Sequence, residues 1–418
     1  MKRYKLLNNV LGWVVFVIAA VTYILTLEST ASFWDCGEFI ASGYKLEVGH
    51  PPGNPIFMLT ARFFANFASS PSEVAYMVNL MSGLLSAATI LLLFWTITRL
   101  AQKIVLREGE TEETMSLGQM IAILGCGLVG ALAYAWSDTF WFSAVEGEVY
   151  AYSSFCTALV FWLILKWESV ADLPHANRYI ILIAYIIGVS IAVHLLNLLC
   201  IPAIVLVYYY RKYKNTDLKG SLIALLVSFV LIVLLLYGLV PGFVEVASWV
   251  ELLFVNVFHL PFNSGVVFYF FLIVGVIAWA IYETYAQRSD KLIKISFLIS
   301  IVLVGIPFIG DGYIIGIVLT AALAYYLFTR KKLAVVAMNT ILLSLFVIFI
   351  GYSSYALIVI RSTANTPMDQ NSPEDIFSLG GYLNREQYGD RPLFYGQTFP
   401  AEIARDANGT AISTKGKA

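Results

Sequence analysis

Residues 74–99 read VAYMVNLMSGLLSAATILLLFWTITR, and this stretch decides the fold class. It carries no charged side chain before Arg99. Crossing the hydrocarbon of a bilayer, about 30 Å thick, takes roughly 20 apolar residues. Because lipid cannot satisfy an open backbone, a segment of this kind has to be helical. The sequence therefore predicts a membrane-spanning helix here.

The same pattern recurs along the chain. Of the 418 residues, 59% are hydrophobic and only 13% are charged, and the mean hydropathy is +0.78. These values lie outside the range of ordinary soluble domains and indicate an all-α polytopic membrane protein. We expect about 11 transmembrane helices, at residues 9–27, 74–99, 118–136, 149–167, 178–194, 195–210, 219–240, 265–285, 294–310, 313–329 and 333–360.

Basic residues predict the orientation of these helices. Lys and Arg gather before the first run and then after every second run, as in the loops 99–107, 211–219 and 330–332. Such clusters stay on the cytoplasmic side, so the N-terminus is expected inside and the C-terminus outside. The N-terminal segment resembles a signal peptide but shows no small-residue cleavage site, so we interpret it as an uncleaved first span. Four cysteines imply no disulfide framework.

Acidic residues mark the first expected outer loop, residues 28–57, which reads ESTASFWDCGEFIASGYKLEVGHPPGNPIF. Asp35 and Glu38 are three residues apart, so a helical turn would place both carboxylates on one face. A carboxylate among apolar residues is costly unless it is paired or used. Asp35 could act as a general base toward an acceptor hydroxyl at the outer face. Alternatively, Ser32 and Asp35 form a capping box that starts a helix.

His50 begins the run His-Pro-Pro-Gly-Asn-Pro in the same loop. A residue that precedes proline is pushed away from the helical region, so this run holds the chain extended. His50 is therefore firmly positioned and is the nearest candidate to contact Glu38, as a ligand or proton shuttle. The alternative is a simple turn back to the membrane.

Three further groups of candidate residues lie at the expected outer face. Glu146 and Glu148 follow an aromatic run, 136–142, that by itself predicts only an interfacial belt. Together with Asp35 they could supply hard oxygen ligands to a divalent metal, although their spacing is generic. His194 stands in an apolar run, where it has either a functional or a packing role. Arg361 could bind a lipid phosphate or extend to the interface.

Signatures of soluble enzymes are missing from the sequence. It contains no P-loop, no dinucleotide glycine fingerprint, no GxSxG and no HExxH. Nucleotide chemistry at the cytoplasmic face and nucleic-acid binding therefore have no support. Residues 361–418 form the one shift in composition, rich in Asn, Asp, Pro and Gly, and we expect an extracytoplasmic segment there after a transmembrane domain at 1–360.

Four segments resemble a known family: FWDCGEFIASGYKLEVGHPPGNP at 33–55, VEGEVYAYSSF at 145–155, VHLLNLL at 193–199 and YLNREQYGDRPLFYGQ at 382–397. They are similar to multispanning proteins of Bacteroidota, long labelled a domain of unknown function, and to a related family of animal transmembrane protein O-mannosyltransferases that act on plexin-type receptors. Many relatives continue into a larger soluble region after the membrane domain. Whether this chain is a truncated form is left open.

The resemblance implies a GT-C glycosyltransferase in the inner (plasma) membrane. Such an enzyme moves a sugar, here expected to be mannose, from a polyprenyl-phosphate donor to Ser or Thr of an exported protein, with inversion. The acids matching the catalytic loop are Asp35 and Glu38, and the expected donor-binding residues are His50, Glu146, Glu148, His194 and Arg361. No cofactor and no metal are expected.

Two other classes of protein compete with this interpretation. A transporter or a flippase for lipid-linked sugars would also need many spans, but it predicts binding residues near the midplane and inverted repeats. The acids instead gather at one face, and no repeat is evident. A purely structural protein leaves Asp35, Glu38 and His50 without a purpose.

Overall fold

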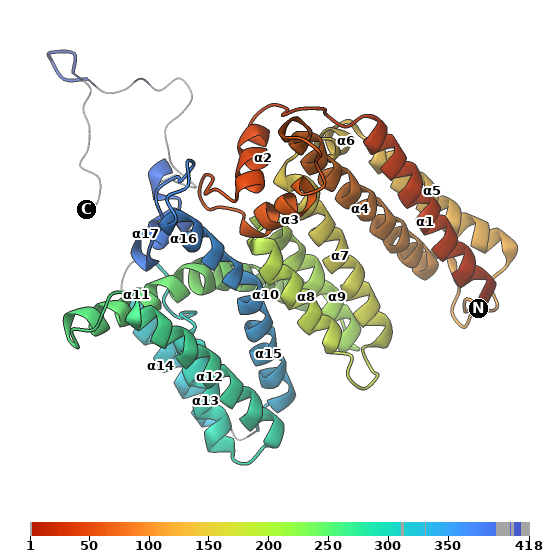
Figure 1. Cartoon of the computed structure of the whole chain (residues 1–418). Coiled ribbons are helices and arrows are strands. Elements are labelled where there is room, and N and C mark those ends of the chain that lie inside the picture. The colour runs from red at the N-terminus through yellow and green to blue at the C-terminus, as the bar shows by residue number, and fades with distance from the viewer. Residues whose placement is uncertain (1, 311–312, 331, 390–401, 403–404, 411–418) are drawn as a thin grey trace.

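A computed structural model describes residues 2–310, 313–330, 332–389, 402 and 405–410. Within these residues the chain is all-α, as predicted, and forms no β-strand (Figure 1). The α-helices are α1 Lys2–Leu25, α2 Cys36–Lys45, α3 Pro55–Ala65, α4 Val74–Val105, α5 Leu117–Ala135, α6 Asp138–Ala144, α7 Val149–Val170, α8 Arg178–Ile191, α9 Ile201–Lys212, α10 Leu218–Val233, α11 Val240–Asn256, α12 Ser264–Ala286, α13 Asp290–Leu303, α14 Tyr313–Thr329, α15 Val335–Tyr352, α16 Ala356–Thr363 and α17 Ile376–Leu383.

The expected polytopic membrane character is confirmed. Among the described residues, 8 helices are long and apolar enough to cross a membrane. They correspond to eight of the predicted runs. The other three runs are covered by α8, α13 and α14, which have 14, 14 and 17 residues. The count of about 11 spans therefore stays a prediction.

Close backbone contacts join the two halves of the bundle. Helix α15 packs along α8, although the two are far apart in the sequence. A Cβ atom added at Gly188 of α8 would lie 2.5 Å from the carbonyl oxygen of Ile348 in α15, and one added at Gly351 would meet the backbone of α8 just as closely. In lipid there is no hydrophobic driving force between helices, so they associate through close packing, which small residues allow. The glycines therefore fix this crossing.

Two predicted helix boundaries are wrong. The run 219–240 was expected to end in an outer loop, but α10 continues through a π-helical turn, Leu234–Leu239, into α11. Figure 1 shows α11 lying across one end of the neighbouring helices. The last run is also interrupted, by a 3₁₀ turn at Ser353–Tyr355, so that Arg361 belongs to the separate helix α16. The predicted break near His194 is present between α8 and the 3₁₀ helix Leu195–Cys200.

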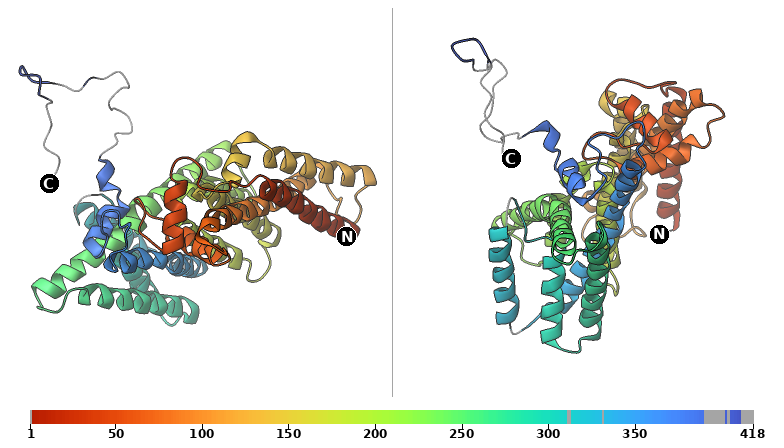
Figure 2. Two further views of the ribbon diagram at one scale, coloured as in Figure 1. Left: turned by 45° about the horizontal axis from the view of Figure 1, so that its top comes forward. Right: turned by 60° about the vertical axis from the view of Figure 1, so that its left-hand side comes forward.

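Acidic and basic loops lie at opposite ends of the bundle. Helices α2, α16 and α17 share one end, which we call the outer end (Figures 1 and 2). At the other, inner end Lys5 lies 3.8 Å from Glu112, and the Arg211 side chain donates to the Glu168 carbonyl. The predicted separation of charge is therefore present. Which end faces the cytoplasm stays a prediction.

Candidate active site

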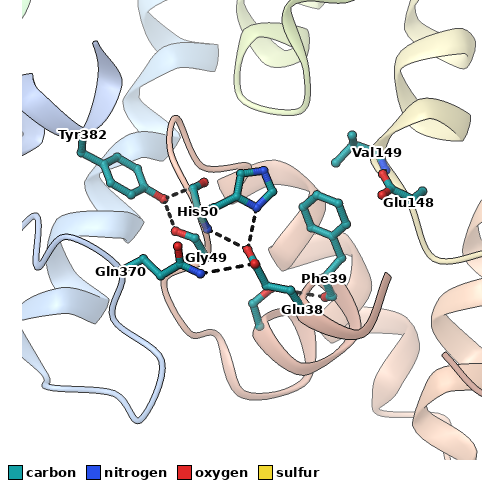
Figure 3. Close-up of polar contacts among 9 residues, drawn as sticks. Glu38, Phe39, Gly49, His50, Glu148, Val149, Gln370 and Tyr382 are labelled. Atoms are coloured by element: carbon teal, nitrogen blue, oxygen red, sulfur yellow. Dashed lines mark hydrogen bonds and ion pairs between the residues drawn. The ribbon is translucent and has the colours of Figure 1, made fainter. Parts of the chain in front are cut away.

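Glu38 and His50 form the centre of the polar cluster at the outer end (Figure 3). Glu38 lies in the first turn of α2, and His50 lies in the loop before α3. The backbone N–H of His50 donates to Glu38 Oε1 at 2.7 Å, and His50 Nδ1 lies 2.8 Å from the same oxygen. Gln370 Nε2 donates to Glu38 Oε2 at 3.3 Å. The predicted contact between His50 and Glu38 is therefore present.

This pairing favours the charged form of both side chains. Burial acts to raise the pKa of Glu38, but the hydrogen bonds and charge of His50 outweigh it and lower that pKa below its ordinary value. The hydrogen bond to Glu38 raises the pKa of His50. His50 is thus a cation over a wider pH range than a free imidazole. Its Nε2 has no hydrogen-bond partner in the part of the chain that the structure describes.

Asp35 lies beside this pair with a free side chain. It is the N-cap residue of α2, but its carboxylate makes no capping hydrogen bond. The predicted capping box of Ser32 and Asp35 is therefore wrong, because α2 begins only at Cys36. The apolar surroundings expected for Asp35 are also wrong: its side chain is exposed, and its neighbours Phe33 and Trp34 are 74% and 88% exposed.

Asp35, Glu38 and His50 are close enough to share a ligand. One oxygen or nitrogen atom from each lies within 4.8 Å of the others, the arrangement a divalent metal would need. The set considered from the sequence, Asp35 with Glu146 and Glu148, does not come together this closely among the described residues. Glu38 Oε1 is already engaged by His50, so a metal at this cluster would compete with the imidazole for that oxygen.

The C-terminal segment contacts the loop that carries His50 from the other side. Val48 forms an isolated parallel bridge with Asp369, and the Gln370 N–H donates to the Val48 carbonyl at 3.1 Å. The buried Tyr382 hydroxyl donates to the Gly49 carbonyl at 2.7 Å, with the His50 carbonyl 3.4 Å away. These contacts join residues more than 300 positions apart, so the loop is fixed by tertiary structure.

Arg361 also contacts this part of the chain, and we call Arg361, Gln370 and Tyr382 together the brace of the loop. Its Nε donates to the Leu46 carbonyl at 2.6 Å, and a terminal nitrogen donates to the Lys45 carbonyl at 3.2 Å. Both acceptors lie at the carboxyl end of α2, where a helix leaves carbonyls without partners and where a cation is stabilising. Arg361 therefore caps α2, and its expected role in donor binding stays a prediction.

Glu146 and Glu148 occupy the turn between α6 and α7. They are 4% and 5% exposed, and Glu148 Oε2 accepts a hydrogen bond from the Val149 N–H. Burial raises the pKa of Glu148 to about 7, and the neighbouring carboxylates of Asp35 and Glu146 act in the same direction. Burial also raises the pKa of Glu146. Both acids are thus shielded from solvent, and within the described residues neither of them forms an ion pair.

His194 occupies the break between α8 and the next helical turn. Its Nδ1 accepts a hydrogen bond from the Leu196 N–H at 3.1 Å, and its ring lies 5.4 Å from that of Tyr150. Burial lowers the pKa of His194, which favours the neutral imidazole. A structural role is visible here, and the expected role in donor binding stays a prediction.

Three residues near the cluster had no assigned role in the sequence: Gln370, Tyr382 and Arg385. The positive charge of Arg385 opposes the rise in the pKa of His50 that Glu38 causes, and it adds to the lowering of the pKa of His194 by burial. Tyr382 and Arg385 stand in the segment 382–397 that carried the family resemblance, which was a usable signal. Residues 390–397 of that segment lie outside the described residues. Gln370 had no signal in the sequence.

Comparison with known proteins shows what the part of the chain that contains this loop is similar to. Residues 35–217 match the family described as "Protein O-mannosyl-transferase TMEM260 N-terminal domain". The mouse protein O-mannosyl-transferase TMEM260 is 27% identical over 209 residues, which cover 50% of this chain and 27% of the mouse protein. The corresponding protein of Dictyostelium discoideum is 23% identical over 189 residues, 44% of this chain and 20% of its own length. No solved structure matches the chain.

The resemblance to the protein O-mannosyltransferase family is thus confirmed for residues 35–217. This range includes Asp35, Glu38, His50 and the turn with Glu148. Arg361 and the rest of the brace lie outside it. The chain spans about a quarter of the length of the curated relatives it matches.

Proposed function

We propose that this protein is a GT-C membrane glycosyltransferase that moves mannose from a polyprenyl-phosphate donor to Ser or Thr of exported proteins at the outer face of the inner membrane. One observation carries the proposal. An exposed carboxylate with a free side chain, Asp35, stands within reach of a charged, braced pair, Glu38 and His50, at the acidic end of the bundle. The similarity of residues 35–217 to protein O-mannosyltransferases supports it.

Asp35 would act as the general base. It accepts the proton of the acceptor hydroxyl while the hydroxyl oxygen attacks the anomeric carbon of the sugar. The bond from that carbon to the lipid phosphate breaks, and the phosphate leaves from the opposite face, so the configuration inverts. Among the three clustered residues, Asp35 suits this role because its carboxylate has no capping hydrogen bond and is exposed to an incoming acceptor.

Glu38 and His50 would serve the leaving group. Glu38 fixes His50 through Nδ1 and keeps the imidazole charged, which leaves Nε2–H to donate to a phosphate oxygen. Charge that develops on the phosphate is best stabilised by donors already held in place. The brace from Gln370 and Tyr382 supplies that rigidity, and Arg385 adds positive charge nearby.

A cavity in the membrane region suits the lipid tail of such a donor. It has a volume of about 660 Å³, is mostly apolar and is lined by residues of α4, α5, α7 and the 3₁₀ helix Leu195–Cys200. Leu196 and Leu199 of its lining directly follow His194, which contacts Tyr150 at the start of α7. A polyprenyl chain in this cavity would therefore extend to the acidic end of the bundle.

The test is sugar transfer in reconstituted vesicles, from radiolabelled polyprenyl-phosphate-mannose to a peptide with Ser and Thr. Asp35→Asn should abolish transfer, whereas Asp138→Asn, at another exposed acid of the outer end, should not. Transfer should persist in a chelator if the enzyme needs no metal. Full activity of Asp35→Asn, or no transfer by the native protein with monophosphate or pyrophosphate donors, would defeat the proposal and favour a transporter.

A further inference from the structure

A second polar cavity lies at the inner end, far from the acidic cluster. It has a volume of about 470 Å³ and is formed where α1, α4 and α7 approach one another. Three cations, one from each helix, line it: Lys5, Arg99 and Lys166. None of these residues takes part in the proposed reaction.

The charge in this cavity is not balanced. Its only acidic lining residue is Glu112, which lies 3.8 Å from Lys5 and accepts a hydrogen bond from Gln102. Within the described residues, Arg99 and Lys166 form no ion pair. Other basic residues of the inner end behave differently, since Lys103 pairs with Glu168 and Arg211 with Asp172. Topology alone requires cations at this end but does not require unpaired ones converging on a cavity.

The lining is also amphipathic. The rings of Trp95 and Trp162 lie with their centroids 5.8 Å apart at an interplanar angle of 32°, and Lys166 Nζ lies 4.8 Å from the Trp162 ring. The side-chain oxygen of Asn8, another lining residue, is buried without a hydrogen-bond partner. A ligand with an anionic group, a hydroxyl and an adjoining apolar part would satisfy all of these surfaces at once.

We propose that this inner cavity binds a phosphate group, of the kind carried by an anionic phospholipid headgroup in the leaflet around it. Arg99 and Lys166 would contact the phosphate oxygens, with Arg99 able to do so through two N–H groups. The indoles of Trp95 and Trp162 would lie against the glycerol and the start of the acyl chains, the usual depth for tryptophan. The site is independent of the transfer reaction.

Titration of the purified full chain in a neutral detergent tests this. The three probes are dioctanoyl phosphatidylglycerol, dioctanoyl phosphatidylcholine and inorganic phosphate. The anionic lipid should bind, and the double variant Arg99→Gln/Lys166→Gln should weaken it about tenfold or more, since each cation near a phosphate contributes on the order of 1 kcal/mol. Lys214→Gln/Lys291→Gln removes two exposed cations of the inner end outside the cavity and should change little.

The probes also separate the sources of phosphate. Competition by inorganic phosphate would identify free phosphate as a sufficient ligand, whereas binding of the lipid alone would identify the headgroup. Equal affinity for the two lipids, or an equal loss in both double variants, would overturn the proposal. Lys166→Gln alone, at an exposed side chain, keeps the test valid if the double variant does not fold, and it should still weaken binding.

Discussion

Two acidic regions at the outer end show opposite behaviour. In the first outer loop, Glu38 is 20% exposed at its side chain, accepts hydrogen bonds from His50 and Gln370, and has a lowered pKa. In the turn before α7, Glu148 is 5% exposed, accepts one hydrogen bond from its neighbour's N–H, and has a pKa of about 7. Burial raises the pKa of both acids, and of the two only Glu38 forms an ion pair within the described residues.

The comparison shows that partners decide which acid is charged at neutral pH. Desolvation raises the pKa of either carboxyl. At Glu38 the His50 ring and backbone outweigh that penalty, whereas at Glu148 the nearby Asp35 and Glu146 add to it. The loop is thus arranged to hold a fixed ion pair, and the turn is arranged to hold a proton.

The largest effect is expected for the substitution Glu38→Gln. The change removes the charge that keeps His50 protonated and oriented, so transfer should fall about 1,000-fold, within the range seen when a positioned acid or base is lost. Transfer in reconstituted vesicles measures it. His50→Gln should cause a similar loss, and the double variant should lose little more, because the two side chains act as one unit. Additive losses would contradict a coupled pair.

The complementary change is Glu148→Gln. The folded protein holds the proton of Glu148 up to about pH 7, compared with an ordinary value of 4.5, so an ionisable Glu148 reduces stability as pH rises through this interval. Gln removes the penalty and should stabilise the protein by up to about 3 kcal/mol above pH 7, at 1.36 kcal/mol per unit. Below pH 4.5 the two proteins should be equally stable.

Thermal unfolding in detergent across this pH range measures the effect. Asp138→Asn changes the same charge at an exposed acid and should leave the pH dependence unaltered. A Glu148→Gln variant that becomes less stable than the native protein as pH rises above 4.5 would show that a partner stabilises the ionised carboxylate, and the contrast with Glu38 would fail.

The substitution Tyr382→Phe measures how much the hydrogen bond from Tyr382 to the loop contributes to stability. The variant keeps the buried ring but removes the hydroxyl that donates to the Gly49 carbonyl. Leaving that carbonyl without its donor should cost about 1 to 2 kcal/mol of unfolding free energy. A matched change, Tyr388→Phe, affects a more exposed tyrosine of the same segment and should cost almost nothing. Equal stability of the two variants would show that the brace does not hold the loop.

The sequence predicted the parts of the site that are local. Asp35, Glu38 and His50 lie within 16 residues, and a helical turn followed by a stiff proline run was enough to bring them together. Gln370 and Tyr382 act on the same loop from more than 330 positions away, and no spacing rule connects them with it. Those contacts form only when the whole bundle is packed, because they join segments that are distant in the sequence.

The sequence likewise predicted the local features of the fold, but not the features that depend on packing. Apolar runs located the long helices, because lipid admits few other structures. They did not locate α11, since the apolar run was expected to end at residue 240, where the chain instead makes a π-helical turn and continues. Hydropathy also failed to show that Arg361 caps α2, because an arginine at the end of an apolar run has the same appearance whether it contacts lipid or protein.

The smallest expected effect concerns the pH dependence of the Glu38–His50 pair. The lowered pKa of Glu38 stabilises the fold above the ordinary value of 4.5, and this contribution is lost as pH falls below it. The raised pKa of His50 stabilises the fold below the ordinary value of 6.5, and this contribution is lost as pH rises through the raised value. The pair therefore contributes fully between pH 4.5 and 6.5. His50→Gln should cost about 1 kcal/mol of unfolding free energy in that window and less above it, because the imidazole of the native protein then loses its charge as well.

Thermal unfolding at one pH inside this window and at one pH above it measures the difference. His175→Gln, at an exposed histidine of the inner end, is the control. A loss that is independent of pH would mean that His50 acts on Glu38 as a neutral hydrogen-bond donor, and the charged pair on which the contrast with Glu148 depends would be absent.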